Sequence, residues 1–173
     1  AKDFVRLSWS CASVMQGGGA GGDNLRYKTF DLLGAAIGEF VNEREGGGYD
    51  SSLFDNMPAS DLLIVIHSLA SFGLTFDDVP NAVEKISQRI TSESLDKFGS
   101  SMIADLYWSL MTMKFMFLPD KLPTVSNVLT KVEESVVDMS INDMSKVLAG
   151  LSIMKKDVSN LYLNLEEKKK VDT

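Results

Sequence analysis

The sequence predicts an all-α protein, organised as an α-solenoid-like stack of helix pairs with a repeat of about 41 residues. A nearly all-apolar helical stretch recurs at equal intervals along the chain, and a more polar amphipathic stretch follows each copy. Strands are not expected, because apolar and polar residues nowhere alternate with a period of two over a useful length.

The recurrence is clearest over six residues. Residues 67–72 (HSLASF) align with residues 108–113 (WSLMTM) at an offset of 41, and a second step of 41 reaches residues 149–154 (AGLSIM). Small residues in each copy would let neighbouring helices approach closely. Core helices of any helical bundle resemble one another, but two equal offsets favour a true repeat.

One helical-repeat domain is expected over residues 1–173. In its first part, residues 9–13 (WSCAS) match the start of the 67–72 stretch at an offset of 58. The extra length is assigned to two glycine-rich loops, at 17–22 and 46–48. The expected units are approximately 2–58, 59–99, 100–140 and 141–170.

Helical apolar spacing predicts two helices in the first unit, over 2–15 and 25–44. The second of them is expected to turn Ile37, Phe40 and Val41 inward on one stripe. These two helices would be separated and followed by the glycine-rich loops.

The second unit begins with an apolar helix predicted over residues 60–72. Ser60 is expected to cap its start, because a serine hydroxyl can accept from an unpaired backbone N–H. Asp61 suits the positive end of the helix dipole. Gly73 is expected to end the helix in a left-handed conformation.

The remaining helices follow from the same spacing. One starts near Pro80 with Val83, Ile86 and Ile90 as its inner stripe, and a connector over 92–100 follows it. The others are predicted over residues 102–114, 123–137, 141–155 and 158–170.

Composition bounds the class of protein. The 173 residues suffice for one domain with a core, and 45% are hydrophobic. The formal net charge of −7 disfavours a free-standing nucleic-acid binder, whose affinity comes largely from neutralising phosphates. The single cysteine, Cys11, allows no internal disulfide and fits a reducing compartment such as cytosol, plastid stroma or mitochondrial matrix. No apolar run is long enough to span a bilayer.

Residues 103–113 (IADLYWSLMTM) resemble the apolar helix of octotricopeptide and FAST-kinase-like repeats, in which a tryptophan, leucines and small residues recur at helical spacing. Residues 65–73 (VIHSLASFG) are similar, with His67 in place of the tryptophan. Heptatricopeptide proteins of apicomplexans look similar too. The resemblance covers residues 60–155 loosely. It implies a helical-repeat protein of plastids or mitochondria that acts on RNA or serves as a structural subunit.

The chain departs from the RNA-binding members of those families in its charge. They carry basic or polar residues that recur on groove-lining helices, whereas no basic position recurs through all the units here. Lys114 and Lys155 match each other, but Gly73 stands at the corresponding earlier place. This departure favours the structural role.

Each candidate for chemistry has a plainer interpretation. His67, the only histidine, lies where another unit has Trp108, which predicts a packing role rather than that of a base. Cys11 lies in an apolar helix without an evident activating group. The glycine-rich loops lack the Lys-Ser/Thr that a phosphate-binding loop requires.

Two pairs of adjacent acids, at 77–78 and 166–167, suit helix starts or solvent-facing positions better than catalysis. Several methionines fit an adaptable core or contact surface, namely Met102, Met111, Met113 and Met116. We therefore expect no enzymatic activity, no catalytic, cofactor-binding or metal-binding residues, and no cofactor.

The expected function is that of a non-catalytic scaffold or linker subunit of a larger organellar complex, such as a photosystem–antenna assembly, a mitoribosome or a respiratory complex. Its partners would be protein subunits, with peripheral contact to a membrane complex. The alternative is an organellar RNA-binding helical-repeat module, which would require a basic groove. Plastid or mitochondrial localisation follows from the family resemblance alone.

Overall fold

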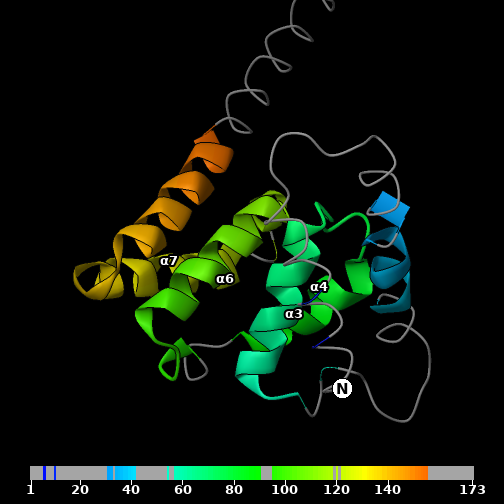
Figure 1. Cartoon of the computed structure of the whole chain (residues 1–173), viewed down its shortest axis with the longest axis horizontal. Helices are drawn as coiled ribbons and strands as arrows, with labels where there is room; N and C mark the ends of the chain where they lie inside the picture. The colour runs from blue at the N-terminus through cyan, green and yellow to red at the C-terminus, as the bar shows by residue number, and fades with distance from the viewer. Residues whose placement is uncertain are drawn as a thin grey trace, which may run out of the picture.

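In the computed structural model, every regular element of the described residues is a helix, so the all-α prediction is confirmed (Figure 1). The residues that the structure describes are 6, 10, 31–32, 34–41, 54, 57–90, 95–118, 120 and 122–155. The predictions for 2–15, 158–170, Cys11, both glycine-rich loops and the 166–167 acids lie wholly or largely outside them.

Four α-helices and two short 3-10 helices have both ends described. They are α3 (Ala59–Ser71), α4 (Pro80–Arg89), α6 (Ser100–Thr112), η1 (Phe115–Phe117), α7 (Leu122–Ser135) and η3 (Val136–Asp138). Residues 34–41 and 141–155 are helical as well. No helix among the described residues is both long enough and apolar enough to cross a membrane.

The ends of α3 show one correct and one wrong prediction. Gly73 is left-handed with φ of 74°, and its N–H donates to the Ala70 carbonyl at 2.9 Å, as expected of a helix C-terminus. Ser60, however, caps nothing. The extended Pro58 precedes the helix and its carbonyl accepts from Leu62 at 2.9 Å, so Ser60 lies inside the first turn.

The helix α6 ends in the same manner, although without a glycine. Lys114 has φ of 62°, and it is the one non-glycine residue with positive φ in the described part of the chain. Its N–H donates to the Met111 carbonyl at 3.1 Å. The two helix ends are linked, because the N–H of Phe76 donates to the carbonyl of Met113 at 3.1 Å.

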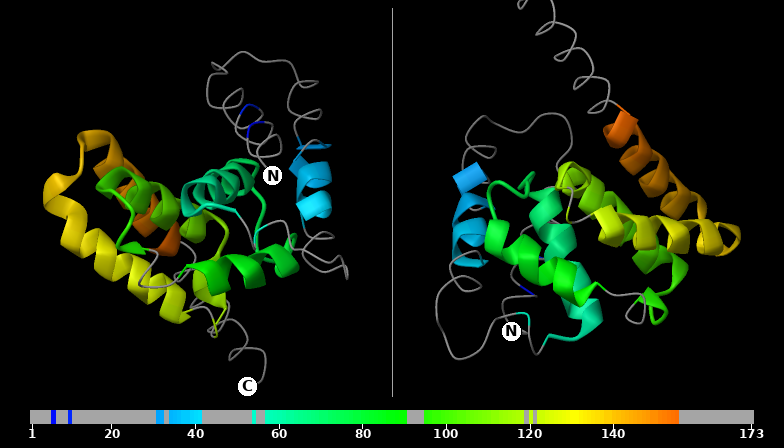
Figure 2. Two further views of the ribbon diagram at one scale, coloured as in Figure 1. Left: turned by 90° about the horizontal axis from the view of Figure 1, so that it is seen from below. Right: turned by 180° about the vertical axis from the view of Figure 1, so that it is seen from behind.

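The apolar helices lie next to one another, with α6 between α3 and the 141–155 helix (Figure 1). The more polar helices α4 and α7 run along another side of the molecule (left view of Figure 2). Fully buried residues from both sets form the core, among them Leu69, Leu110, Ile86 and Val128. Met111 and Met113 are also fully buried, so these methionines belong to the core rather than to a contact surface.

Residues 34–41 pack across the end of α3 through glycines. A Cβ at Gly38 would lie 2.9 Å from Leu74 Cδ1, so a larger residue there would require the Leu74 side chain to move. Ile37 and Val41 are buried as predicted. Phe40 is 46% exposed, and its inward placement is wrong, because only a narrow stripe of this helix faces the rest of the protein.

The chain that leads into α3 is anchored from the end of α4. The Arg89 guanidinium donates through Nη2 to the Met57 carbonyl at 2.7 Å and through Nη1 to the Phe54 carbonyl. Phe54 and Met57 are fully buried, so these carbonyls require partners. Arg89 thereby joins α4 to the entry of α3.

Replacing Leu110 by alanine tests the core. Leu110 is fully buried in the central helix α6, and the variant should lose about 2–5 kcal/mol of unfolding free energy in urea titrations. Leu122→Ala, at a leucine that is 48% exposed, should lose far less. Equal effects of the two substitutions would contradict the described packing of α6.

Candidate functional site

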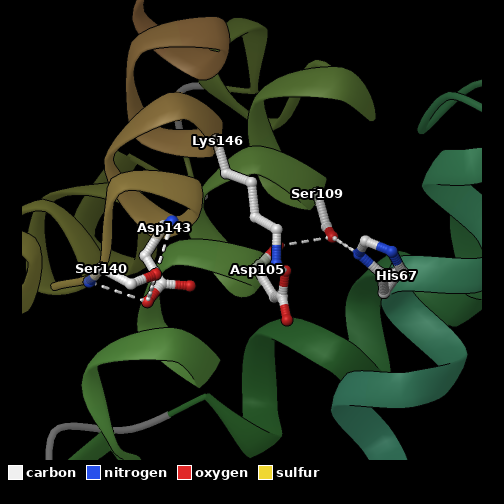
Figure 3. Close-up of polar contacts among 6 residues, drawn as sticks. All are labelled: His67, Asp105, Ser109, Ser140, Asp143 and Lys146. Atoms are coloured by element: carbon white, nitrogen blue, oxygen red, sulfur yellow. Dashed lines mark hydrogen bonds and ion pairs between the residues drawn. The ribbon is translucent and has the colours of Figure 1, made fainter.

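The most notable polar groups lie along the boundaries between the three apolar helices (Figure 3). We call this set the inter-helix polar cluster, and its members are His67, Asp105, Ser109, Ser140, Asp143 and Lys146. His67 comes from α3, Asp105 and Ser109 from α6, and Lys146 from the 141–155 helix. The cluster follows the direction in which the helices are stacked.

His67 is a buried side chain, only 8% exposed, on the face of α3 that meets α6. Its ring lies 5.1 Å from the ring of Trp108, with an angle of 45° between the two planes. Both rings thus contribute to the same apolar contact. The His67 Nδ1 atom lies 3.4 Å from the Ser109 hydroxyl oxygen.

The protons at this contact can be assigned from the available acceptors. The Ser109 hydroxyl donates to the Asp105 carbonyl at 2.7 Å. A serine hydroxyl has a single proton, so toward His67 it acts as the acceptor and Nδ1 as the donor. An activated serine would instead donate to the imidazole, so the contact does not have the geometry of a nucleophile and its base.

The charge state of His67 follows from its surroundings. Burial lowers the pKa of His67 below 6.5, because the imidazolium would lose its hydration. The Asp105 carboxylate raises that pKa and the Lys146 ammonium lowers it, both to a smaller extent than burial. The ring is therefore neutral at neutral pH.

Asp105 and Lys146 join α6 to the 141–155 helix. The Lys146 Nζ atom lies 2.5 Å from Asp105 Oδ1, and both side chains are partly shielded from solvent. An ion pair of this kind is worth little where water screens it and more where burial excludes water. The pair links the side of α6 to the first half of the 141–155 helix.

The start of the 141–155 helix is capped by a reciprocal pair. The Ser140 hydroxyl and backbone N–H donate to Asp143 Oδ2 at 2.7 and 3.1 Å, and the Asp143 N–H donates to the Ser140 hydroxyl at 3.2 Å. This arrangement is a capping box. The Ser140 hydroxyl is the main cause that lowers the pKa of Asp143, so its carboxylate stays charged and serves the helix end.

The other acidic candidates also have structural roles or face solvent. Asp78 accepts from the Thr75 N–H at 2.7 Å and from its hydroxyl at 2.8 Å, which closes the turn before α4. Asp77 is exposed. Within the described residues, no three histidine, cysteine or acidic side chains are placed to hold a metal ion.

Sequence reasoning missed a groove of about 510 Å³ beside α3. Its lining includes the apolar Leu62, Leu63, Ile66 and Leu106 and the basic Arg89 and Lys97. The one sequence signal for this groove is the helical spacing of the leucines. That spacing predicts a buried helix face and does not distinguish it from a groove. The lining of the groove mixes apolar side chains with the polar Gln88, Arg89 and Lys97, and the Arg89 guanidinium is engaged with backbone carbonyls.

Comparison of the chain with family models, with curated proteins and with solved structures finds no match. The function is therefore inferred from the chain's own residues. The described contacts are those of helix packing: a stacked neutral histidine, serine hydroxyls turned back onto their own helices, an inter-helix ion pair and a capping box.

Gly150 marks the closest approach between α6 and the 141–155 helix. A Cβ there would lie 2.9 Å from Tyr107 Cε1 and 3.3 Å from Met111 Cγ. Gly150→Val should therefore destabilise the protein by about 1–3 kcal/mol in urea unfolding. Gly99→Ala is the matched control, because nothing lies within 4 Å of its added Cβ. A neutral Gly150→Val variant would show that these helices are not in close contact.

The single histidine allows a pH test. The unfolded chain binds a proton at His67 near pH 6.5, whereas the folded protein binds it only at lower pH. Stability should thus fall as the pH drops below 6.5, by at most about 1.4 kcal/mol per pH unit from this group. Urea unfolding at a pH above and a pH below this value should show a larger acid loss for the wild type than for His67→Phe. Equal losses would contradict the burial of His67.

Proposed function

We propose that the protein is a non-catalytic helical scaffold or linker subunit of a larger organellar protein complex, built as an α-solenoid-like repeat. The observation that supports this most is the recurrence of the same contacts at one spacing along successive apolar helices. A stacked array of helices offers an extended surface to partners and needs no reactive group.

The backbone supports the proposal through its helix ends. The helix α6 begins and ends 41 residues after α3, and the next apolar helix begins at residue 141, which is 41 residues further on. Gly73 and Lys114, both left-handed, are separated by the same interval. A lysine tolerates this conformation poorly, so its occurrence there favours a position dictated by a repeated turn.

The side chains support it as well. His67 and Trp108 occupy corresponding positions and pack against each other. Ser68, Ser109 and Gly150 also correspond, and all three are buried. The two serine hydroxyls each donate to a carbonyl of their own helix at 2.7 Å, so that position stays small and polar groups stay paired. These positions favour close approach of successive helices.

Two described lysines that could serve the RNA-binding alternative are paired with carboxylates. Lys146 is paired with Asp105 at 2.5 Å. Lys131 lies 2.6 Å from Asp96 and 2.7 Å from Glu134, and the hydrogen bond to Asp96 is the largest cause that raises the pKa of Lys131. Each pair offsets a charge that phosphate binding would use.

A size measurement in plastid and mitochondrial extracts tests the scaffold. In mild detergent the endogenous chain should migrate with a complex much larger than itself, and purified subunits of that complex should co-elute. Migration as a free monomer would refute the proposal. Disruption of the complex by ribonuclease, together with RNA retention of the purified chain in low-salt filter binding, would instead favour the RNA-binding alternative.

A further inference from the structure

The outer face of the 141–155 helix is apolar and uncovered. Ile141 is 79% exposed, Met144 39% and Leu148 65%. These residues follow one another at helical spacing, and exposed Ser145 and Ser152 lie among them. We call these five residues the outer stripe. Exposed apolar residues that lie side by side in this way are typical of contact surfaces.

The same positions are covered in the earlier helices. Met144 and Leu148 correspond to Ile103 and Tyr107 of α6, and each of those is only 1% exposed. The 141–155 helix thus has apolar residues at positions that are buried in α6, but no described residue covers them here. The outer stripe therefore occupies the positions that, 41 residues earlier in α6, form a buried packing surface.

The stripe is also nearly free of charge. Between residues 142 and 155 the one carboxylate is Asp143, which is buried and bonded to Ser140. The chain as a whole carries a formal net charge of −7, so two copies repel each other across most contacts. Through the outer stripe they can approach without opposing carboxylates.

The order of residues in the stripe makes it self-complementary. In an antiparallel pair of these helices centred between Lys146 and Val147, Ile141 faces Ser152 of the other copy, and Leu148 faces Ser145. A large apolar residue then meets a small one along the stripe, which is how helices pack closely. A two-fold axis repeats each contact twice.

We propose that the protein forms a two-fold symmetric dimer, in which the outer stripes of two copies pack antiparallel. The contact is one helix wide and 15 residues span about 22 Å, so the association is of the weak, micromolar class. It does not depend on the organellar partners proposed above.

Sedimentation velocity of the purified chain tests the dimer. From low-micromolar to about 200 µM the wild type should shift from monomer toward dimer. Leu148→Glu should weaken the association at least about tenfold, because it would bury an unpaired carboxylate. Leu122→Glu, at another exposed leucine on α7, should leave it unchanged.

Cysteine pairs test the antiparallel register in a Cys11→Ser background. Two Ser145→Cys residues would lie about 4.5 Å apart along the helix axis, and two Ser152→Cys residues about 16 Å apart. A short bifunctional maleimide should therefore cross-link the first variant and not the second.

Three outcomes would overturn the dimer: a wild type that stays monomeric throughout, equal dimerisation of Leu148→Glu, or preferential cross-linking at residue 152. A monomeric wild type would mean that the stripe is covered by residues 156–173 or by a different protein. The scaffold proposal is tested separately, by migration in organelle extracts, so the failure of either proposal leaves the other distinguishable.

Discussion

The structure depends on the close approach of three successive apolar helices. The approach is possible because one position in each helix is small, at Ser68, Ser109 and Gly150. At Gly150 even a methyl group would come within 2.9 Å of the Tyr107 ring. Because the backbones come so near, the large side chains at neighbouring positions interlock, and fully buried Leu69 and Leu110 fill the space between layers. The more polar helices then cover the sides of this stack.

The polar groups between these helices form hydrogen bonds and ion pairs that are compatible with the close packing. Buried polar atoms are usually hydrogen-bonded, and several of those between these helices find partners within the same helix or on the next one. The Ser109 hydroxyl serves the Asp105 carbonyl, and the Asp105 carboxylate holds Lys146. His67 is neutral beside Trp108, since burial lowers its pKa. The Ser109 hydroxyl donates to the Asp105 backbone carbonyl rather than to the His67 ring, which is not the arrangement of a nucleophile and its base.

The 141–155 helix, the last apolar helix that the structure describes, has two different faces. Its inner face is buried: Gly150 lies against Tyr107 and Met111 of α6, and Asp143, which belongs to the capping box, is buried as well. Its outer face has the same apolar character as the buried faces of α3 and α6, but it remains exposed at Leu148. In the helical repeat proposed above, this would be a terminal face, and such faces are capped or paired. The exposed apolar face is the observation on which the proposed association with a second copy rests.

The sequence by itself determined the all-α class, the positions of the apolar helices and the left-handed end of α3 at Gly73, because these follow from local periodicity and backbone preference. It also indicated that His67 packs where another helix has a tryptophan. Only the tertiary structure decided that Phe40 is exposed, that Ser60 caps nothing, and that Asp105 pairs with Lys146. Those outcomes depend on which helix faces meet and at what distance. Contacts between residues far apart in the chain determine that distance, and it cannot be predicted from the local sequence pattern.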